Sequence, residues 1–93
     1  MYATIRRYSG SADLANQLAA RKDEVIALIS GVPGYRAYYL LQAGDDTISV
    51  TVCDDESGTE RSNEVAAGWI RENMPEVASS PPEVSAGEVV VSG

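Results

Sequence analysis

The side chains of this chain that could take part in chemistry include no imidazole. The 93 residues contain no histidine and a single cysteine, Cys53. Without histidine, the Ser-His-Asp and Cys-His nucleophile systems and the usual ligand sets of zinc and non-haem iron are excluded. Cys53 ends a strand-like pattern, where a small half-buried residue is a simpler interpretation than a reactive thiol. We therefore expect neither a metal site nor a histidine-activated nucleophile.

Carboxylates are the remaining candidate ligands, in the clusters Asp45-Asp46 and Asp54-Asp55-Glu56. Both clusters fall where turns are expected, so solvated turn residues are the simpler interpretation and a weak divalent-ion site is the alternative. The sequence also has no P-loop and no G-x-G-x-x-G motif, which argues against a nucleotide cofactor. We expect no cofactor.

Composition narrows the class of protein further. The net charge of −7 argues against nucleic acid or an anionic membrane surface as a partner. No apolar stretch has the length of a signal peptide or a membrane span, so a cytoplasmic location is expected. A chain of 93 residues with 44% hydrophobic side chains predicts one globular domain, residues 1–93.

Hydrophobic periodicity predicts six elements in the order β-α-β-β-α-β. Strands are indicated by alternation and helices by apolar residues at three- and four-residue spacing. The expected ranges are strand 2–8, helix 12–29, strands 35–41 and 47–53 hinged on 44–46, helix 60–73, and strand 83–91. This order is typical of the ferredoxin-like α+β fold, an antiparallel sheet with both helices on one face.

The limits of the two helices follow from capping residues. Ser11 is a candidate N-cap of the first helix, and Gly31 a candidate left-handed residue at its end. Ser57 or Thr59 could cap the second helix, and Pro75 is expected to close it.

The strand 35–41 is apolar on both of its faces. Tyr38 and Leu40 lie on the opposite face from the alternate residues of the strand, and the helices can cover only one face. We expect Tyr8, Tyr38, Leu40 and Val90 to leave an exposed apolar patch on the uncovered face. Because monomers rarely tolerate a large patch of this kind, the pattern predicts a homodimer in which two sheets pack face to face into a barrel.

Five segments of the chain carry a family resemblance. They are I-R-R-Y, G-V-P-G-Y-R-A-Y-Y-L, I-S-V-T-V-C-D-D, S-N-E-V-A-A-G-W-I-R-E-N and G-E-V-V-V. With them the chain resembles the antibiotic biosynthesis monooxygenase-like (ABM) family of dimeric α/β barrel proteins over nearly its whole length. The resemblance implies a ferredoxin-like fold, a dimer, and a cavity between sheet and helices that in enzymatic members takes polycyclic aromatics, quinols or haem. Haem-degrading members hold iron through a helix histidine, which this chain lacks.

The resemblance thus implies the cofactor-independent branch, in which a phenol or quinol is deprotonated and its anion reacts with O₂. Enzymes of this branch use an asparagine and a tryptophan on the second helix, which makes Asn63, Trp69 and Asn73 the candidate catalytic residues. At about 100° per residue, Asn63 and Trp69 lie about 120° off a shared face. Trp69 and Asn73 are four residues apart and share a face of the helix. Helix packing or helix-end roles are the alternatives for all three.

Four strand residues are candidates for ligand binding: Arg6, Tyr8, Tyr38 and Tyr39. Packing within the sheet is the alternative for the tyrosines, and pairing with acidic neighbours is the alternative for the arginine. Two hypotheses follow. The chain is a cofactor-free monooxygenase acting on an aromatic or quinol-like substrate, or a non-catalytic dimeric module for ligand binding or interaction.

Overall fold

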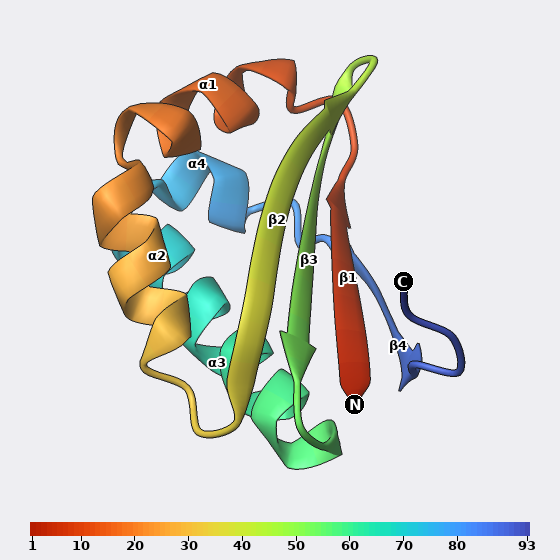
Figure 1. Cartoon of the computed structure of the whole chain (residues 1–93). Helices are drawn as coiled ribbons and strands as arrows, with labels where there is room; N and C mark the ends of the chain where they lie inside the picture. Colours follow the sequence, from red (N-terminus) through yellow and green to blue (C-terminus); the bar gives the residue numbers. More distant parts are fainter.

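The structure is a computed structural model that describes residues 1–93, except for the side chain of Ala12. Its elements follow one another as in the ferredoxin-like fold, with an extra helical segment in each half (Figure 1). Their bounds are β1 Tyr2–Tyr8, α1 Ala12–Ala20, α2 Lys22–Ser30, β2 Tyr35–Ala43, β3 Asp46–Cys53, α3 Glu56–Asn73, α4 Pro75–Ala78 and β4 Glu83–Glu88.

The four strands form one open antiparallel sheet in the order β2-β3-β1-β4. The helices all lie on one face of this sheet (Figure 1). The predicted α+β ferredoxin-like fold is therefore confirmed. The strand order follows from the sequence order, because each β-α-β unit leaves room for a strand of the other unit to insert.

The two faces of the sheet differ in chemistry. On the face that the helices cover, β1 contributes Thr4, Arg6 and Tyr8, which are all buried, and β3 contributes buried Thr and Ser side chains. On the opposite face, Ile5 pairs across to Val50, and Tyr39 pairs to Val50 from the other side. The uncovered face is thus the more apolar one.

This arrangement corrects the prediction about which residues face away from the helices. Tyr8 is only 7% exposed in the core, and Tyr38 and Leu40 pack against that core on the helix side. The uncovered face carries Tyr39 and Leu41 instead, with Tyr39 61% exposed. Because β2 is apolar on both faces, its periodicity alone could not tell which face the helices would cover.

The helices differ from the prediction at their ends. The first predicted helix is divided at Arg21, whose φ of −118° and ψ of 31° interrupt the helical conformation. Ser11 is at the N-cap position but makes no capping hydrogen bond. The second predicted helix begins earlier, at Glu56, because the Asp55 carboxylate accepts a hydrogen bond from the Gly58 amide. Asp55 is therefore the cap, and neither Ser57 nor Thr59 is.

The connections also differ in detail. Gly31 has a right-handed φ of −75°, and the left-handed residue of that turn is Gly34, with φ of 80°. Pro75 closes α3 but also begins the short helix α4. At the first position of a helix the backbone N–H has no partner within the helix, so the N–H that proline lacks is not needed there. The last strand ends at Glu88, so that Val90 lies beyond it and is 89% exposed.

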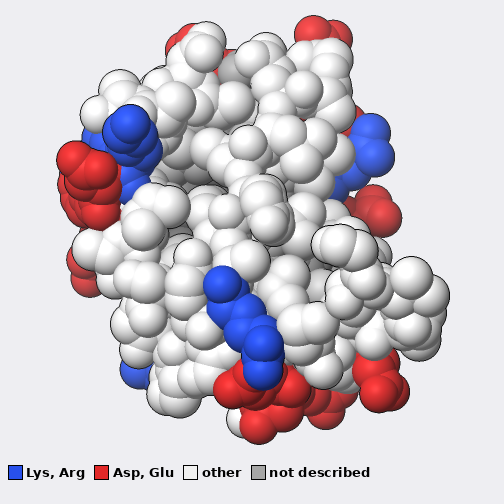
Figure 2. Space-filling view, in the orientation of Figure 1, with Lys and Arg blue, Asp and Glu red and all other residues white. Residues whose placement is uncertain are grey.

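The core lies between the helices and the sheet. Its buried cluster is made by residues of β1, α1, α2 and α3 together with the residue that joins α3 to α4, namely Tyr8, Leu14, Leu18, Val25, Ile70 and Met74. In the view of Figure 2, most charged side chains lie toward the periphery, one basic side chain extends from the lower centre to the lower edge, and uncharged atoms cover most of the rest. Within the described residues, no helix combines the length and apolarity needed to cross a membrane.

Candidate functional site

A cavity of about 430 Å³ opens beside α3 and α4 on the helix side of β1 and β4. Its volume is in the range of small-molecule sites. Its polar lining comes from Arg6, Tyr8, Asn63 and Arg71. The rest of its lining is apolar and consists of Ala67, Ile70, Val77, Ala78, Pro81, Pro82 and Val84. The cavity therefore combines apolar walls with a small group of polar side chains.

Arg6 is the central polar residue of this cavity. It sits in the middle of β1, is only 3% exposed, and projects to the helix side because it alternates with exposed neighbours. Its Nη1 donates to Oδ1 of Asn63 at 2.7 Å, and Nδ2 of Asn63 donates to the Thr4 hydroxyl at 3.2 Å. The Nε of Arg6 has no hydrogen-bond partner. A buried guanidinium is thus held in place by Asn63, while its enclosed Nε is left unpaired.

Two tyrosines flank this guanidinium. Burial raises the pKa of the Tyr8 phenol and of the Tyr38 phenol, and the nearby positive charge of Arg6 opposes that rise without cancelling it. Both phenols therefore stay protonated at neutral pH and can donate hydrogen bonds. Arg6, Tyr8 and Tyr38, three of the ligand-binding candidates, come together on the helix side of the sheet.

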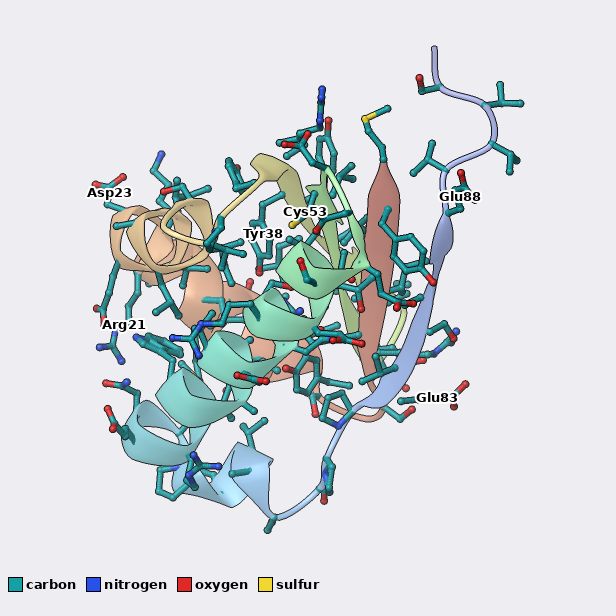
Figure 3. All side chains as sticks on the ribbon, turned by 90° about the horizontal axis from the view of Figure 1, so that it is seen from below. Arg21, Asp23, Tyr38, Cys53, Glu83 and Glu88 are labelled. Carbon is teal, nitrogen blue, oxygen red and sulfur yellow. The ribbon has the colours of Figure 1, made fainter. Side chains whose placement is uncertain are left out.

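A second, much smaller space also borders Arg6. It measures about 30 Å³, enough for about one water molecule, and Arg6, Tyr38, Ser49 and Trp69 contribute to its wall. The Ser49 hydroxyl has no hydrogen-bond partner. Tyr38 reaches this region from β2, beneath the helices (Figure 3). The space is too small for a ring-bearing ligand, so the larger cavity is the candidate site.

Trp69 and Asn73 belong to a different cluster. The Trp69 indole donates to Oε2 of Glu24 at 2.8 Å, and the Arg21 guanidinium lies over its ring at 4.8 Å from the centroid. Arg21 also donates to Oδ1 of Asn73 at 3.1 Å (Figure 3 shows Arg21 beside the helices). This cluster joins α2 to the C-terminal half of α3. The structure therefore brings Trp69 and Asn73 together but places Asn63 apart, at Arg6.

Tyr39, the remaining ligand-binding candidate, lies on the uncovered face of the sheet and does not line the cavity. Ala67 and Arg71 also line the cavity, although neither was predicted from the sequence. The spacing in the sequence could have indicated these two residues. Asn63, Ala67 and Arg71 follow one another at four-residue intervals and so form one stripe of α3.

The donor set gives no support for a bound metal. Among the described residues, no three His, Cys, Asp or Glu side chains lie close enough to hold an ion. Cys53 is fully buried, and burial raises the pKa of its thiol. The cavity can offer hydrogen-bond donors and positive charge within apolar surroundings. The donors and the positive charge favour the ionised form of an oxygen acid.

No family model and no curated protein matches the chain. Several solved structures match the chain in fold. A protein of unknown function from Nitrosomonas europaea, NE2512, is 21% identical with a TM-score of 0.75, and the match covers 99% of this chain and 91% of that one. A monooxygenase from the gene ActVA-Orf6 of Streptomyces coelicolor, in complex with nanaomycin D, is 16% identical with a TM-score of 0.63, covering 98% and 92%.

SnoaB, a cofactor-independent oxygenase from Streptomyces nogalater, is 14% identical with a TM-score of 0.59, covering 99% of this chain and 93% of that one. Another matching chain is described as a dimeric ferredoxin-like protein. At these identities the likeness establishes the fold alone. The chain has the fold of the antibiotic biosynthesis monooxygenase-like proteins, as the sequence resemblance predicted.

Proposed function

We propose that this protein is a cofactor-independent monooxygenase acting on an aromatic or quinol-like substrate. The observation that carries the proposal is the 430 Å³ apolar cavity with the buried guanidinium of Arg6 in its wall. The proteins of the same fold that are described as a monooxygenase and as a cofactor-independent oxygenase support it.

The reaction that suits such a site converts a ring carbon bearing two hydrogens, conjugated with a phenol, into a carbonyl. The substrate loses a proton, and its anion passes electrons to O₂ and forms a carbon–oxygen bond. Loss of water from the resulting peroxide leaves one oxygen atom on the ring and places the other in water. The carbon loses two hydrogens and gains one oxygen, so that O₂ supplies the whole oxidation.

The residues of the cavity would act on the first of these steps. Arg6 and the protonated Tyr8 phenol would stabilise the substrate anion, because positive charge and hydrogen-bond donors favour the ionised form. Asn63 would position Arg6 through its 2.7 Å hydrogen bond and so act as a positioning residue. The apolar wall from Ala67 to Val84 would hold the ring and limit access of water.

Oxygen uptake with a panel of anthrone-like and quinol substrates tests this function. Ala67→Leu narrows the cavity from α3, and Ala27→Leu adds the same side chain to the exposed surface of α2 as a matched control. We expect uptake by the wild type, a loss of about tenfold or more in Ala67→Leu, and no loss in Ala27→Leu. No uptake with any substrate would contradict the proposal.

A non-catalytic binding module is the second candidate function. The observation that favours it is the separation of Asn63, which bonds to Arg6, from Trp69, which bonds to Glu24. This cavity therefore has no tryptophan in its lining. Saturable binding of a ring-bearing ligand without oxygen uptake would support this second function over the first.

We also propose that the protein acts as a homodimer. The uncovered face of the sheet supports this, since most of its residues on β1, β2 and β3 are apolar and several of these are large and exposed. The apolar residues are Ala3 and Ile5 of β1, Ala37, Tyr39 and Leu41 of β2, and Ile48, Val50 and Val52 of β3. A second copy placed on this face would cover it and turn two open sheets into a barrel.

A further inference from the structure

The proposed reaction joins two substrates of very different size, a ring and O₂. A ring that fills the 430 Å³ cavity would occupy the opening through which it entered. O₂ is small and apolar, so it can pass through spaces that exclude a ring. Two further spaces between the helices and the sheet are lined mainly by apolar side chains and are candidates for such a passage.

The outer cavity, the larger of these two spaces, measures about 230 Å³ and lies between α1, α2 and β2. It is lined by Leu18, Ala19, Lys22, Val25, Ile26, Tyr38 and Leu40. Lys22 is exposed at the start of α2, where its ammonium group can stay in water while its stem covers apolar surface. An apolar cavity offers water few hydrogen-bond partners and favours apolar guests such as xenon. The outer cavity is therefore suited to O₂.

The inner space, the volume of about 30 Å³ that borders Arg6, connects the outer cavity to the candidate site. The residues that line both the outer cavity and the inner space are Leu18, Val25, Tyr38 and Leu40. The residues that line both the inner space and the 430 Å³ cavity are Arg6, Tyr8 and Ile70. The outer cavity and the 430 Å³ cavity have no lining residue in common, so the inner space is the link between them.

Arg6 marks the end of this series of spaces. Its side chain lines both the inner space and the 430 Å³ cavity. When the substrate anion passes electrons to O₂, negative charge develops on the oxygen, and a positive charge held nearby stabilises it. An O₂ molecule in the inner space is therefore close to the charge that its reduction requires.

We propose that the outer cavity and the inner space form a route by which O₂ enters beside α1 and α2 and reaches Arg6 and the ring substrate. This inference rests on the proposed function and gives its second reactant a path separate from that of the ring. The inner space has room for about one small molecule, so it admits O₂ and excludes a ring. Because Tyr38 and Leu40 lie on the helix side of β2, the route does not lie on the face proposed for a second copy.

Xenon tests this route without any turnover, because xenon is apolar and is visible by X-ray diffraction. In wild-type crystals under xenon pressure, we expect a xenon atom in the outer cavity, against Val25 and Leu40. Ala19→Phe narrows this cavity from α1, and Ala20→Phe places the same side chain on the exposed surface beside it as a matched control. We expect the xenon site to be lost in Ala19→Phe and retained in Ala20→Phe. An outer cavity that holds ordered water or no xenon in the wild type would overturn the proposal.

Steady-state kinetics at varied O₂ concentration test whether the route serves the reaction. Ala19→Phe is expected to raise the KM for O₂ about three- to tenfold and to leave the KM for the ring substrate unchanged, because it alters the route and not the substrate cavity. Leu40→Phe, where the outer cavity meets the inner space, is expected to act in the same direction, with circular dichroism confirming that it folds. Ala20→Phe should change neither constant. A KM for O₂ that is unchanged in Ala19→Phe, or raised equally in Ala20→Phe, would overturn the proposal.

The failure of this inference can be told apart from the failure of the proposed function. Xenon in the outer cavity without oxygen uptake by any substrate retains a site for a small apolar molecule and removes the oxygenase. Oxygen uptake by a substrate, with no xenon in the outer cavity and no effect of Ala19→Phe on the KM for O₂, retains the oxygenase and removes the route.

Discussion

Asp46 connects the turn between β2 and β3 to the end of β1. Its Oδ1 accepts a hydrogen bond from the Gly10 amide at 3.0 Å, and its Oδ2 accepts one from Nε of Arg7 at 2.8 Å. The Gly10 amide first, and then Arg7, hold the pKa of the Asp46 carboxyl below its usual value. This carboxylate therefore stabilises the native state most when it is ionised.

Because its pKa is lower in the folded than in the unfolded state, Asp46 contributes stability above the unfolded value, about 3.9. That contribution is lost as the pH falls through the folded value. We predict that Asp46→Asn lowers the melting temperature at pH 7 and has a smaller effect near pH 3, where the wild-type carboxyl is also largely neutral. Thermal melts followed by circular dichroism at both pH values measure this. Asp45→Asn, the exposed neighbour, is the control, and an equal loss in both variants at pH 7 would contradict the prediction.

Single residues show how far the sequence could lead toward the site. Arg6, Tyr8 and Tyr38 were named as candidates from their residue types, but Tyr8 and Tyr38 were expected on the uncovered face of the sheet and lie instead on the helix side. The cluster of Trp69 with Glu24 and Arg21 was not recognisable, because it joins side chains 45 or more residues apart through the packing of two helices. Such contacts have no local signal in the sequence.

At the scale of elements, α3 approaches the sheet closely at one glycine. A Cβ atom on Gly58 would lie 2.8 Å from Cβ of Cys53 and 2.8 Å from the Pro33 carbonyl oxygen. Gly68, on the same helix, has open space, with the nearest atom, on Arg71, at 3.8 Å. Glycine is therefore required at the first position for packing and tolerated at the second.

These two glycines provide a matched pair of substitutions. Gly58→Ala is expected to lower the free energy of unfolding by about 1–3 kcal/mol, because backbone and a buried side chain must move to admit the methyl group. Gly68→Ala is expected to raise it by about 0.5–1 kcal/mol, since alanine favours a helix over glycine. Urea denaturation of both variants measures the difference. Stabilisation by Gly58→Ala would contradict the packing described for the start of α3.

The elements themselves were largely predictable, and the errors have physical causes. Strands β1, β2 and β3 agree with the sequence to within a few residues because alternation is a local signal. The break at Arg21 was missed, since the apolar spacing of α1 and α2 continues through it. The strand β4 stops at Glu88, short of the valines that the pattern included.

At the scale of the whole molecule, the uncovered face of the sheet determines the expected assembly. Ile5 on this face is 42% exposed and Ile26 on α2 is 45% exposed, so the two positions differ in location and not in exposure. We predict that Ile5→Glu shifts the protein to monomer, because a charge would be buried between two sheets, whereas Ile26→Glu leaves it dimeric. Sedimentation velocity at micromolar concentration measures this. A wild type that sediments as a monomer would contradict the homodimer.

The sequence indicated that the sheet would have an apolar face that the helices leave uncovered, but not which residues form it. Both faces of β2 are apolar, and the choice between them depends on where Arg6 and the threonines of β1 and β3 are best placed. The folded chain places these polar groups beneath the helices, beside the cavity. The same choice thus creates the polar wall of the candidate site and leaves the apolar face uncovered.

The proposed function requires that the cavity beside Arg6 serve the direct transfer of oxygen from O₂ to a ring substrate. The most direct measurement is mass spectrometry of the product formed from an anthrone-like substrate under heavy-isotope dioxygen. We expect one heavy oxygen atom in each product molecule, and loss of this product in Ala67→Leu but not in Ala27→Leu. A product without the heavy isotope, or no product above the rate without protein, would contradict it.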